Sequence, residues 1–359
     1  MKIEENYSLK NHNTFNVDVK AKLYTEVSSI KDSLNILRKY PKEKILVLGD
    51  GSNTLLIKDW EGIVIRPMIK TIRKVKENEQ FIYIESGSGT NWDHFVRHCV
   101  ANNYAGIENL VMIPGTVGGA VAQNIAAYGQ NITDTLVSVR AVDIKSKKKV
   151  MLLPEECGYE YRRSNFKNKW RYRYIITSAV FQLRKNTKEF ELSYHERAGR
   201  YGSILEELNS FAKEPYTIQD VMQAVINQRT KRLPSVDEYG TCGSFFENPV
   251  VPLKKYEELS KMISELQCYP VEDLRYHIKD WKEYSKDDFV KIPAGRILDE
   301  LGWRGKWIGN VGVSEKHALC VVSNKEATGK EILDFVHEMQ KDVKLKYDID
   351  LISEVNIIE

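Results

Sequence analysis

The sequence lacks the features that mark secreted, membrane-bound and metal-binding proteins. Residues 1–13 contain no apolar core of signal-peptide length, and no later window reaches the roughly 18 uninterrupted apolar residues of a membrane helix. The 5 cysteines are widely spread, with no C-x-x-C pair and no histidine at ligand spacing. We therefore expect a cytoplasmic protein with reduced thiols, no structural metal and no membrane partner.

The sequence also lacks an excess of charge of either sign. Its 53 Lys and Arg residues are balanced by 50 Asp and Glu residues, which leaves a formal net charge of +3. We expect no nucleic-acid partner, because such binding usually needs a strongly basic surface. There is no internal repeat or low-complexity tract. We expect a monomer that acts on small molecules.

What is present is a chain of 359 residues, longer than a single core usually supports. Hydrophobic patterning divides it into three expected units. Residues 1–66 form a first α/β unit, residues 67–232 a second, and residues 233–347 a third. Residues 348–359 alternate like a strand, and we expect them to return to the second unit.

The local patterns predict individual elements within these units. Strands are expected at residues 21–27, 45–48, 54–57, 62–66, 81–84, 138–144, 174–183 and 318–323. Helices are expected at residues 29–39, 217–230, 250–266 and 328–346, with a further helix capped by Thr90. Residues 190–208 are polar and indicate an insertion or lid.

Two glycine-rich segments could each bind a phosphate, because glycine lets successive backbone N–H groups converge on an anion. One is residues 49–53 (GDGSN) and the other is residues 113–120 (IPGTVGGA). Neither has the spacing and context of a Rossmann fingerprint, which weakens a simple NAD-dehydrogenase interpretation. A lone G-x-G is usually a tight turn, but two such loops with Ser, Thr or Asn favour a dinucleotide.

Taken together, the motifs resemble the UDP-N-acetylenolpyruvoylglucosamine reductase family over nearly the whole chain. They are residues 13–15 (NTF), 48–53 (LGDGSN), 113–119 (IPGTVGG), 123–129 (QNIAAYG), 161–164 (YRRS), 243–249 (GSFFENP), 294–299 (AGRILD) and 353–355 (SEV). The resemblance implies an α+β protein with an FAD-binding fold of the vanillyl-alcohol-oxidase (PCMH) type. In that fold two α/β FAD-binding subdomains are followed by an α+β substrate-binding domain. Residues 192–194 (LSY) resemble the form with an inserted tyrosine loop.

The resemblance implies an FAD-dependent oxidoreductase with NADPH as hydride donor. Its reaction would reduce UDP-N-acetylglucosamine enolpyruvate to UDP-N-acetylmuramate, in peptidoglycan precursor and cell wall biosynthesis. Two alternatives remain open. An alcohol oxidase on the same fold would share the glycine loops, and an inert nucleotide-sugar binder would bind UDP without flavin.

The resemblance also implies roles for individual residues. Ser244 would donate a proton, while Arg162 and Glu354 would stabilise the enolate-like charge on the substrate, the latter if protonated or hydrogen-bonded. The expected FAD-binding residues are Gly49, Gly51, Ser52, Asn53, Ile113, Pro114, Gly115, Thr116, Gly118, Gly119 and Asn124. The expected substrate-binding residues are Tyr161, Tyr194, Arg229, Arg232 and Asn248. Without the motifs, most of these residue types would more often be turn residues or surface ion pairs.

Two positions depart from the family pattern, and one histidine has no assigned role. Arg232 stands where lysine is usual, which keeps the charge but changes its geometry. Asp50 stands where glycine or alanine is usual, and we expect its side chain to point away from the diphosphate. His317 lies near a family motif, and we interpret it as structural.

Overall fold

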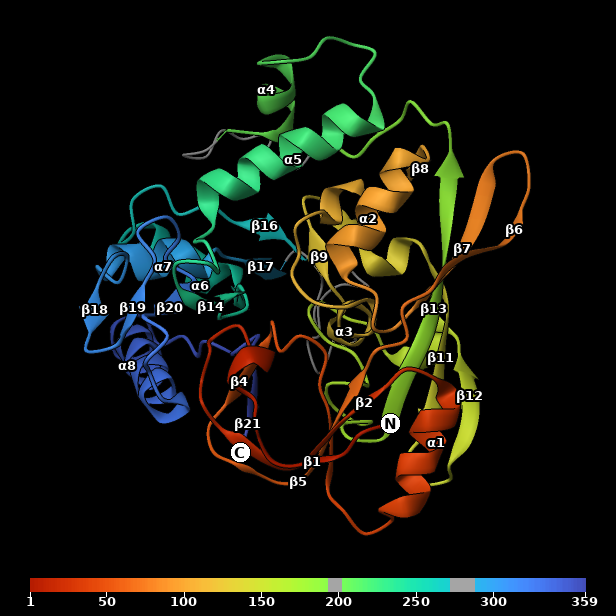
Figure 1. Cartoon of the computed structure of the whole chain (residues 1–359). Helices are drawn as coiled ribbons and strands as arrows, with labels where there is room; N and C mark the ends of the chain where they lie inside the picture. The colour runs from red at the N-terminus through yellow and green to blue at the C-terminus, as the bar shows by residue number, and fades with distance from the viewer. Residues whose placement is uncertain (193–201, 272–287) are drawn as a thin grey trace. The chain divides into compact units, whose positions relative to one another are not determined.

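The structure, a computed structural model, describes residues 1–192, 202–271 and 288–359 (Figure 1). The chain divides into two units, each built from three separate segments. Unit 1 comprises Met1–Tyr7, Ala21–Asp50 and Trp60–Lys231. Unit 2 comprises Ser8–Lys20, Gly51–Asp59 and Arg232–Glu359. The first glycine loop is therefore shared between them.

The first sheet of unit 1 has the strand order β1-β2-β5-β3. Its strands are β1 (Glu4–Ser8), β2 (Lys20–Val27), β3 (Ile45–Val47) and β5 (Trp60–Pro67). β5 pairs in parallel with both β2 and β3. Helix α1 (Ile30–Lys39) connects β2 to β3, as parallel strands require a crossover. Ser29 caps this helix by accepting a hydrogen bond from the backbone N–H of Asp32 at 3.1 Å.

The second sheet of unit 1 is antiparallel, with the order β12-β11-β13-β7-β6. Its strands are β6 (Ile72–Glu77), β7 (Phe81–Gly87), β11 (Leu136–Asp143), β12 (Lys148–Leu152) and β13 (Tyr174–Lys185), with β8 (Tyr104–Ala105) paired to β13. Trp92, Phe95 and Phe181 pack ring against ring beneath α2 (Trp92–Ala101). The short helix α3 (Val117–Gln123) also packs on this sheet, followed by the hairpin β9 (Ala126–Ala127) and β10 (Gln130–Asn131).

Two further helices complete unit 1. They are α4 (Ile204–Asn209) and α5 (Ile218–Arg232), which lie side by side at the top of Figure 1. Their apolar residues Ile204, Leu208 and Val221 are buried in the same core as α2 and α3. Hydrophobic burial therefore ties α5, and the end of the predicted insertion at residues 204–208, to the core.

The described residues of unit 2 form three small sheets. One has the order β14-β20-β19-β18, from β14 (Gly240–Ser244), β18 (Trp307–Ile308), β19 (Val311–Val313) and β20 (Cys320–Ser323). The second joins β15 (Val250–Pro252), β16 (Tyr269–Pro270) and β17 (Phe289–Lys291). The third pairs β4 (Thr54–Leu56) with β21 (Asn356–Ile358). The helices are α6 (Leu253–Ser260), α7 (Ala294–Glu300) and α8 (Gly329–Tyr347).

Most expected elements are confirmed, and three details differ. Helix α2 is capped by Asn91, which accepts from the N–H of His94 at 2.9 Å, whereas Thr90 donates to the carbonyl of Thr71. Residues 250–252 are a strand, because they pair with β17 before α6 begins. Residues 356–358 pair in parallel with β4, not with a strand of the second expected unit. Alternation predicts a strand but carries no information about its partner.

No helix within the described ranges combines the length and apolar character that crossing a membrane requires. Likewise, residues 1–192, 202–271 and 288–359 contain no cluster of His, Cys, Asp and Glu able to hold a metal ion.

Candidate functional site

Within unit 1, the two predicted glycine loops come together at Gly49 and Thr116. A Cβ atom on Gly49 would lie 2.9 Å from Oγ1 of Thr116, so glycine allows this close approach. Thr116 itself caps α3, because its hydroxyl accepts from the N–H of Gly119 at 3.2 Å. Gly115 precedes it with a φ of 114°, a conformation that favours glycine.

A third glycine loop, residues 87–90, joins the same cluster. The carbonyl oxygen of Ser88 accepts from the N–H of Gly118 at 2.9 Å, and that of Thr90 accepts from the N–H of Val117 at 2.9 Å. This segment is not among the phosphate-binding loops predicted from the sequence. Its Gly-Ser-Gly pattern matches the signal used to choose the other two loops, so the same argument could have found it.

Two polar atoms of this cluster are buried and have no hydrogen-bond partner among the described residues, namely Oγ of Ser86 and Oγ of Ser88. At the far end of α3, Oδ1 of Asn124 is in the same condition. Buried polar atoms are normally paired, so such atoms near converging glycine loops fit a site for a polar ligand. The donors and close backbone approaches present here therefore fit the diphosphate of FAD.

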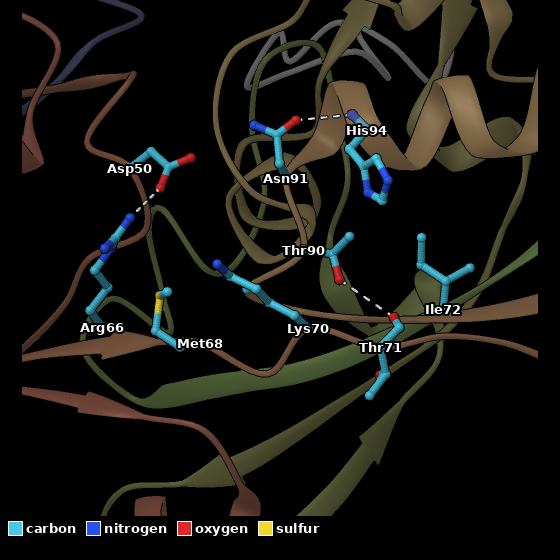
Figure 2. A pocket seen from close by; sticks show the side chains of 10 residues that line it. Asp50, Arg66, Met68, Lys70, Thr71, Ile72, Thr90, Asn91 and His94 are labelled. Carbon is cyan, nitrogen blue, oxygen red and sulfur yellow. Dashed lines mark hydrogen bonds and ion pairs between the residues drawn. The ribbon is translucent and has the colours of Figure 1, made fainter. Parts of the chain in front are cut away.

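Beside the first loop lies a cavity of about 490 Å³ (Figure 2). Asp50 and Arg66 lie on one side of it and His94 and Ile72 on the other, as Figure 2 shows. Oδ1 of Asp50 accepts from Nη2 of Arg66 at 2.8 Å, and Arg66 also donates to Glu26 at 3.1 Å. The carboxylate of Asp50, the residue that departs from the family pattern, therefore forms an ion pair with Arg66.

In unit 2, the remainder of the first loop is fixed to the carboxyl-terminal strand. Gly51 has a φ of 62°, and a Cβ atom there would collide with the backbone of His12 and Asn13. Nδ2 of Asn53 donates to the carbonyl of Glu354 at 3.3 Å, and the carbonyl of Asn53 accepts from the N–H of Asn356 at 3.1 Å. Ser52 lies between these two anchored residues.

The structure brings Ser244 and Glu354 together in unit 2. Ser244 ends β14 at an irregularity in its pairing with β20, where Gly243 has a φ of 72°. The next residue, Phe245, accepts at its carbonyl from the N–H of Glu354 at 2.8 Å. An isolated bridge between Phe246 and Ser353 continues this pairing. The serine and the glutamate, distant in sequence, therefore flank the same backbone pairing.

Arg162 lies in unit 1, at a tight turn with Tyr161. Glu160 and Arg163 exchange backbone hydrogen bonds of 3.2 and 3.0 Å around it, and Arg162 has a φ of 55°. Its guanidinium lies 5.3 Å from the centre of the Tyr161 ring. Nδ2 of Asn124 donates to the carbonyl of Glu160 at 2.7 Å, so the end of α3 holds the turn.

The expected substrate-binding residues are placed in different ways. Nη2 of Arg229 donates to the carbonyl of Met112 at 3.2 Å, just before the second glycine loop. Oδ1 of Asn248 accepts from the N–H of Ala294 at 3.0 Å, at the start of α7. Arg232 is the last residue of α5. Tyr194 lies outside the described residues.

His317 is close enough to Arg232 for their charges to interact. The pKa of His317 is lowered to about 4, chiefly by burial and also by the charges of Arg304 and Arg232, while Asp299 acts in the opposite direction. Its Nδ1 atom accepts from the N–H of Leu319 at 3.1 Å, which assigns the Nε2 atom as the protonated one in the neutral ring. A neutral histidine therefore lies beside an expected substrate-binding arginine.

The fold and the converging glycine loops define an FAD-binding protein. The family model described as an FAD binding domain matches residues 21–147, and the model of the UDP-N-acetylenolpyruvoylglucosamine reductase C-terminal domain matches residues 235–358. The chain belongs to the UDP-N-acetylenolpyruvoylglucosamine reductase family.

Full-length relatives establish this membership. The reductase of Flavobacterium johnsoniae is 38% identical over 358 residues, covering 100% of both chains. That of Bacteroides fragilis is 34% identical over 357 residues, covering 99% of this chain and 100% of the relative. The crystal structure of the Thermus caldophilus reductase matches the fold with a TM-score of 0.67 at 22% identity, over 100% of both chains.

Proposed function

We propose that the chain uses NADPH to reduce UDP-N-acetylglucosamine enolpyruvate to UDP-N-acetylmuramate through bound FAD, in peptidoglycan precursor synthesis. Membership of the reductase family along the whole chain is the observation that carries this proposal. The backbone hydrogen bond between Phe245 and Glu354, which adjoins Ser244, supports it, because an inert binder or an alcohol oxidase would not need the serine and the glutamate together.

The reaction sets two tasks for the protein. FAD, held by the residues of the glycine loops, would supply the chemistry that transfers a hydride from NADPH to the terminal carbon of the enolpyruvyl group. The substrate is left with negative charge that spreads into its carboxylate. The chain must stabilise this charge and must deliver a proton to the neighbouring carbon.

We assign these tasks to the three candidate residues. Ser244 donates the proton, and its position after the left-handed Gly243 supports a hydroxyl held at a defined point of the backbone. Arg162 binds the carboxylate, since a guanidinium offers paired donors to its two oxygens. Glu354 acts on the enolate in its protonated or hydrogen-bonded form, because a free carboxylate would repel the charge.

The remaining assignments are also proposals. FAD is held by the predicted residues of the glycine loops, with Ser86 and Ser88 as further candidates, and the UDP portion by Tyr161, Tyr194, Arg229, Arg232 and Asn248. We propose a cytoplasmic monomer without a nucleic-acid partner, organised as FAD-binding residues 1–66 and 67–232 and substrate-binding residues 233–347.

Absorbance spectroscopy tests the function directly. The purified protein, reconstituted with FAD, should show flavin bands that bleach on addition of NADPH without oxygen. The bands should return when UDP-N-acetylglucosamine enolpyruvate is added. A protein that cannot take up FAD would contradict the assignment of an FAD-dependent enzyme. Flavin bands that bleach with NADPH but do not return would contradict the assignment of the enolpyruvyl sugar as the substrate.

A further inference from the structure

One buried carboxylate, that of Glu207, fastens α4 to the end of α5. Its Oε1 atom accepts from Nδ2 of Asn227 at 2.9 Å. Its Oε2 atom accepts from Nε2 of Gln228 at 3.1 Å and forms an ion pair with Lys231. Glu207 is 8% exposed and Gln228 is 1% exposed. The carboxylate thus engages three residues from the last turns of one helix.

The helix that carries Glu207 is itself firmly held. The hydroxyl of its cap, Ser203, accepts from the N–H of Glu206 at 3.0 Å, and the carboxylate of Glu206 accepts from the N–H of Ser203 at 2.8 Å. Ile204 and Leu208 are buried in the core of unit 1. The cap and the buried residues therefore fix the position of α4, which carries Glu207.

The end of α5 carries the cations expected to bind the UDP diphosphate. Arg229 reaches the carbonyl of Met112, which has a φ of 59° and whose N–H donates to Asp93 at 2.6 Å. Arg232 ends the same helix. Any rotation or fraying of this last turn would therefore displace both arginines.

Electrostatics explains why one acidic residue matters here. Arg229, Lys231 and Arg232 place three positive charges within four residues at the end of α5, and Arg229 and Arg232, three residues apart, repel each other. Burial raises the pKa of Glu207, but hydrogen bonds from Lys231, Asn227 and Gln228 outweigh it, and the net pKa is lowered. Glu207 is thus charged at neutral pH and neutralises Lys231.

We propose that Glu207 is a positioning residue for nucleotide-sugar binding: it binds Lys231 and fixes the final turn of α5, so that Arg229 and Arg232 are set for the UDP diphosphate. This inference rests on the proposed function of those two arginines. It assigns the third cation of the run, Lys231, to a structural pair instead of a substrate contact.

Titration calorimetry with UDP tests the proposal without relying on turnover. Glu207→Gln keeps the size of the side chain and removes its charge, and we expect UDP binding about tenfold weaker. With the enolpyruvyl sugar, KM should rise similarly while kcat changes little, because ground-state binding is lost. Unchanged or tighter UDP binding would overturn the proposal; tighter binding would mean that the released Lys231 contacts the diphosphate itself.

Glu85→Gln is a matched control. Glu85 is also a buried carboxylate, 4% exposed, which accepts from Arg140 at 2.5 Å and Ser178 at 2.6 Å on the second sheet. The Glu85→Gln substitution should lower the midpoint of thermal unfolding, as Glu207→Gln does, and should leave the affinity for UDP unchanged. If both variants lost UDP affinity equally, general destabilisation would explain the effect of Glu207→Gln, and the positioning role would be contradicted.

A double-mutant cycle tests the pair itself. Glu207→Gln combined with Lys231→Met should bind UDP no more weakly than Glu207→Gln alone, whereas additive losses would contradict the pairing. If Glu207→Gln does not fold, Asn227→Ala removes one of the same hydrogen bonds and should weaken UDP binding about threefold. Wild-type protein that does not bind UDP would overturn the proposed function as well, which separates the two failures.

Discussion

A few side chains of this reductase-family protein occupy unusual positions because the backbone places them there. Ser244 follows a glycine with a φ of 72°, and no described atom lies within 4 Å of the Cβ that Gly243 lacks. The glycine is therefore required by backbone conformation and not by crowding. It turns the end of β14 and determines where the serine hydroxyl lies.

Ser244→Ala should separate the two half-reactions. Flavin reduction by NADPH needs no proton from the serine and should remain fast. Reoxidation by the enolpyruvyl sugar should slow by roughly 100-fold or more, the usual contribution of a general acid. Stopped-flow absorbance measures both rates, and equal slowing of the two would remove Ser244 from this role.

His317 should make the protein less stable in mild acid. Its pKa of about 4 in the folded chain lies below the ordinary value of 6.5, so protonation favours the unfolded chain. Stability should be unaffected above about pH 6.5 and should fall by about 2 kcal/mol on going to about pH 5. Urea midpoints measured across this range, compared with those of His317→Gln, test the prediction. Parallel curves for the two proteins would contradict it.

At the scale of elements, helix α3 depends on two adjacent glycines with opposite requirements. A Cβ on Gly118 would lie 2.9 Å from Cβ of Ser88, whereas one on Gly119 would have Oγ1 of Thr116 at 3.5 Å, an ordinary contact. Alanine is normally favoured over glycine in a helix by about 1 kcal/mol. At Gly118, contact with Ser88 in the loop of residues 87–90 makes glycine favoured over alanine, whereas no such contact is present at Gly119.

Gly118→Ala should therefore destabilise the protein without flavin by about 1–3 kcal/mol, and Gly119→Ala should leave it unchanged or slightly more stable. Thermal unfolding of the two apoproteins gives the comparison. If both substitutions have effects of the same sign, then the contact with Ser88 does not constrain α3.

The sequence predicts these elements well where the signal is local. The helix at residues 30–39 and the strand at 174–185 follow from periodicity, and the glycine loops follow from composition. Contacts between distant segments could not be predicted in this way. The parallel partner of β21, the contact of residues 87–90 with α3 and the pairing of Glu207 with Lys231 depend on tertiary packing, which a pattern of single residues does not encode.

At the scale of the whole molecule, unit 2 needs segments that lie far outside its main stretch of chain. The N–H of Thr241 donates to the carbonyl of Thr14 at 3.0 Å, and Oγ of Ser323 donates to that of Phe15 at 3.4 Å. β21 has β4 as its partner. Residues 233–359, which are continuous in sequence, therefore lack two segments that belong to the structure of unit 2.

A fragment of residues 233–359 should therefore not fold by itself. It would leave β21 and the edge of β14 without their partners, and unpaired strand edges favour aggregation. Nuclear magnetic resonance of the isolated fragment should show poorly dispersed amide signals. A well-dispersed spectrum would show instead that residues 233–359 fold independently and do not require residues 8–20 and 51–59.

The pairing of β4 with β21 also sets the order of events during synthesis of the chain. Asn53 and Glu354, whose contact adjoins this pairing, are 301 residues apart. At 5–20 residues per second, a ribosome needs about 15–60 s to make the stretch between them. β4 must remain unpaired for all of that time, and the polypeptide cannot complete the surroundings of Glu354 until β21 has left the exit tunnel. A chaperone that binds apolar strands of nascent chains would need to remain bound to residues 54–56 for the longest time.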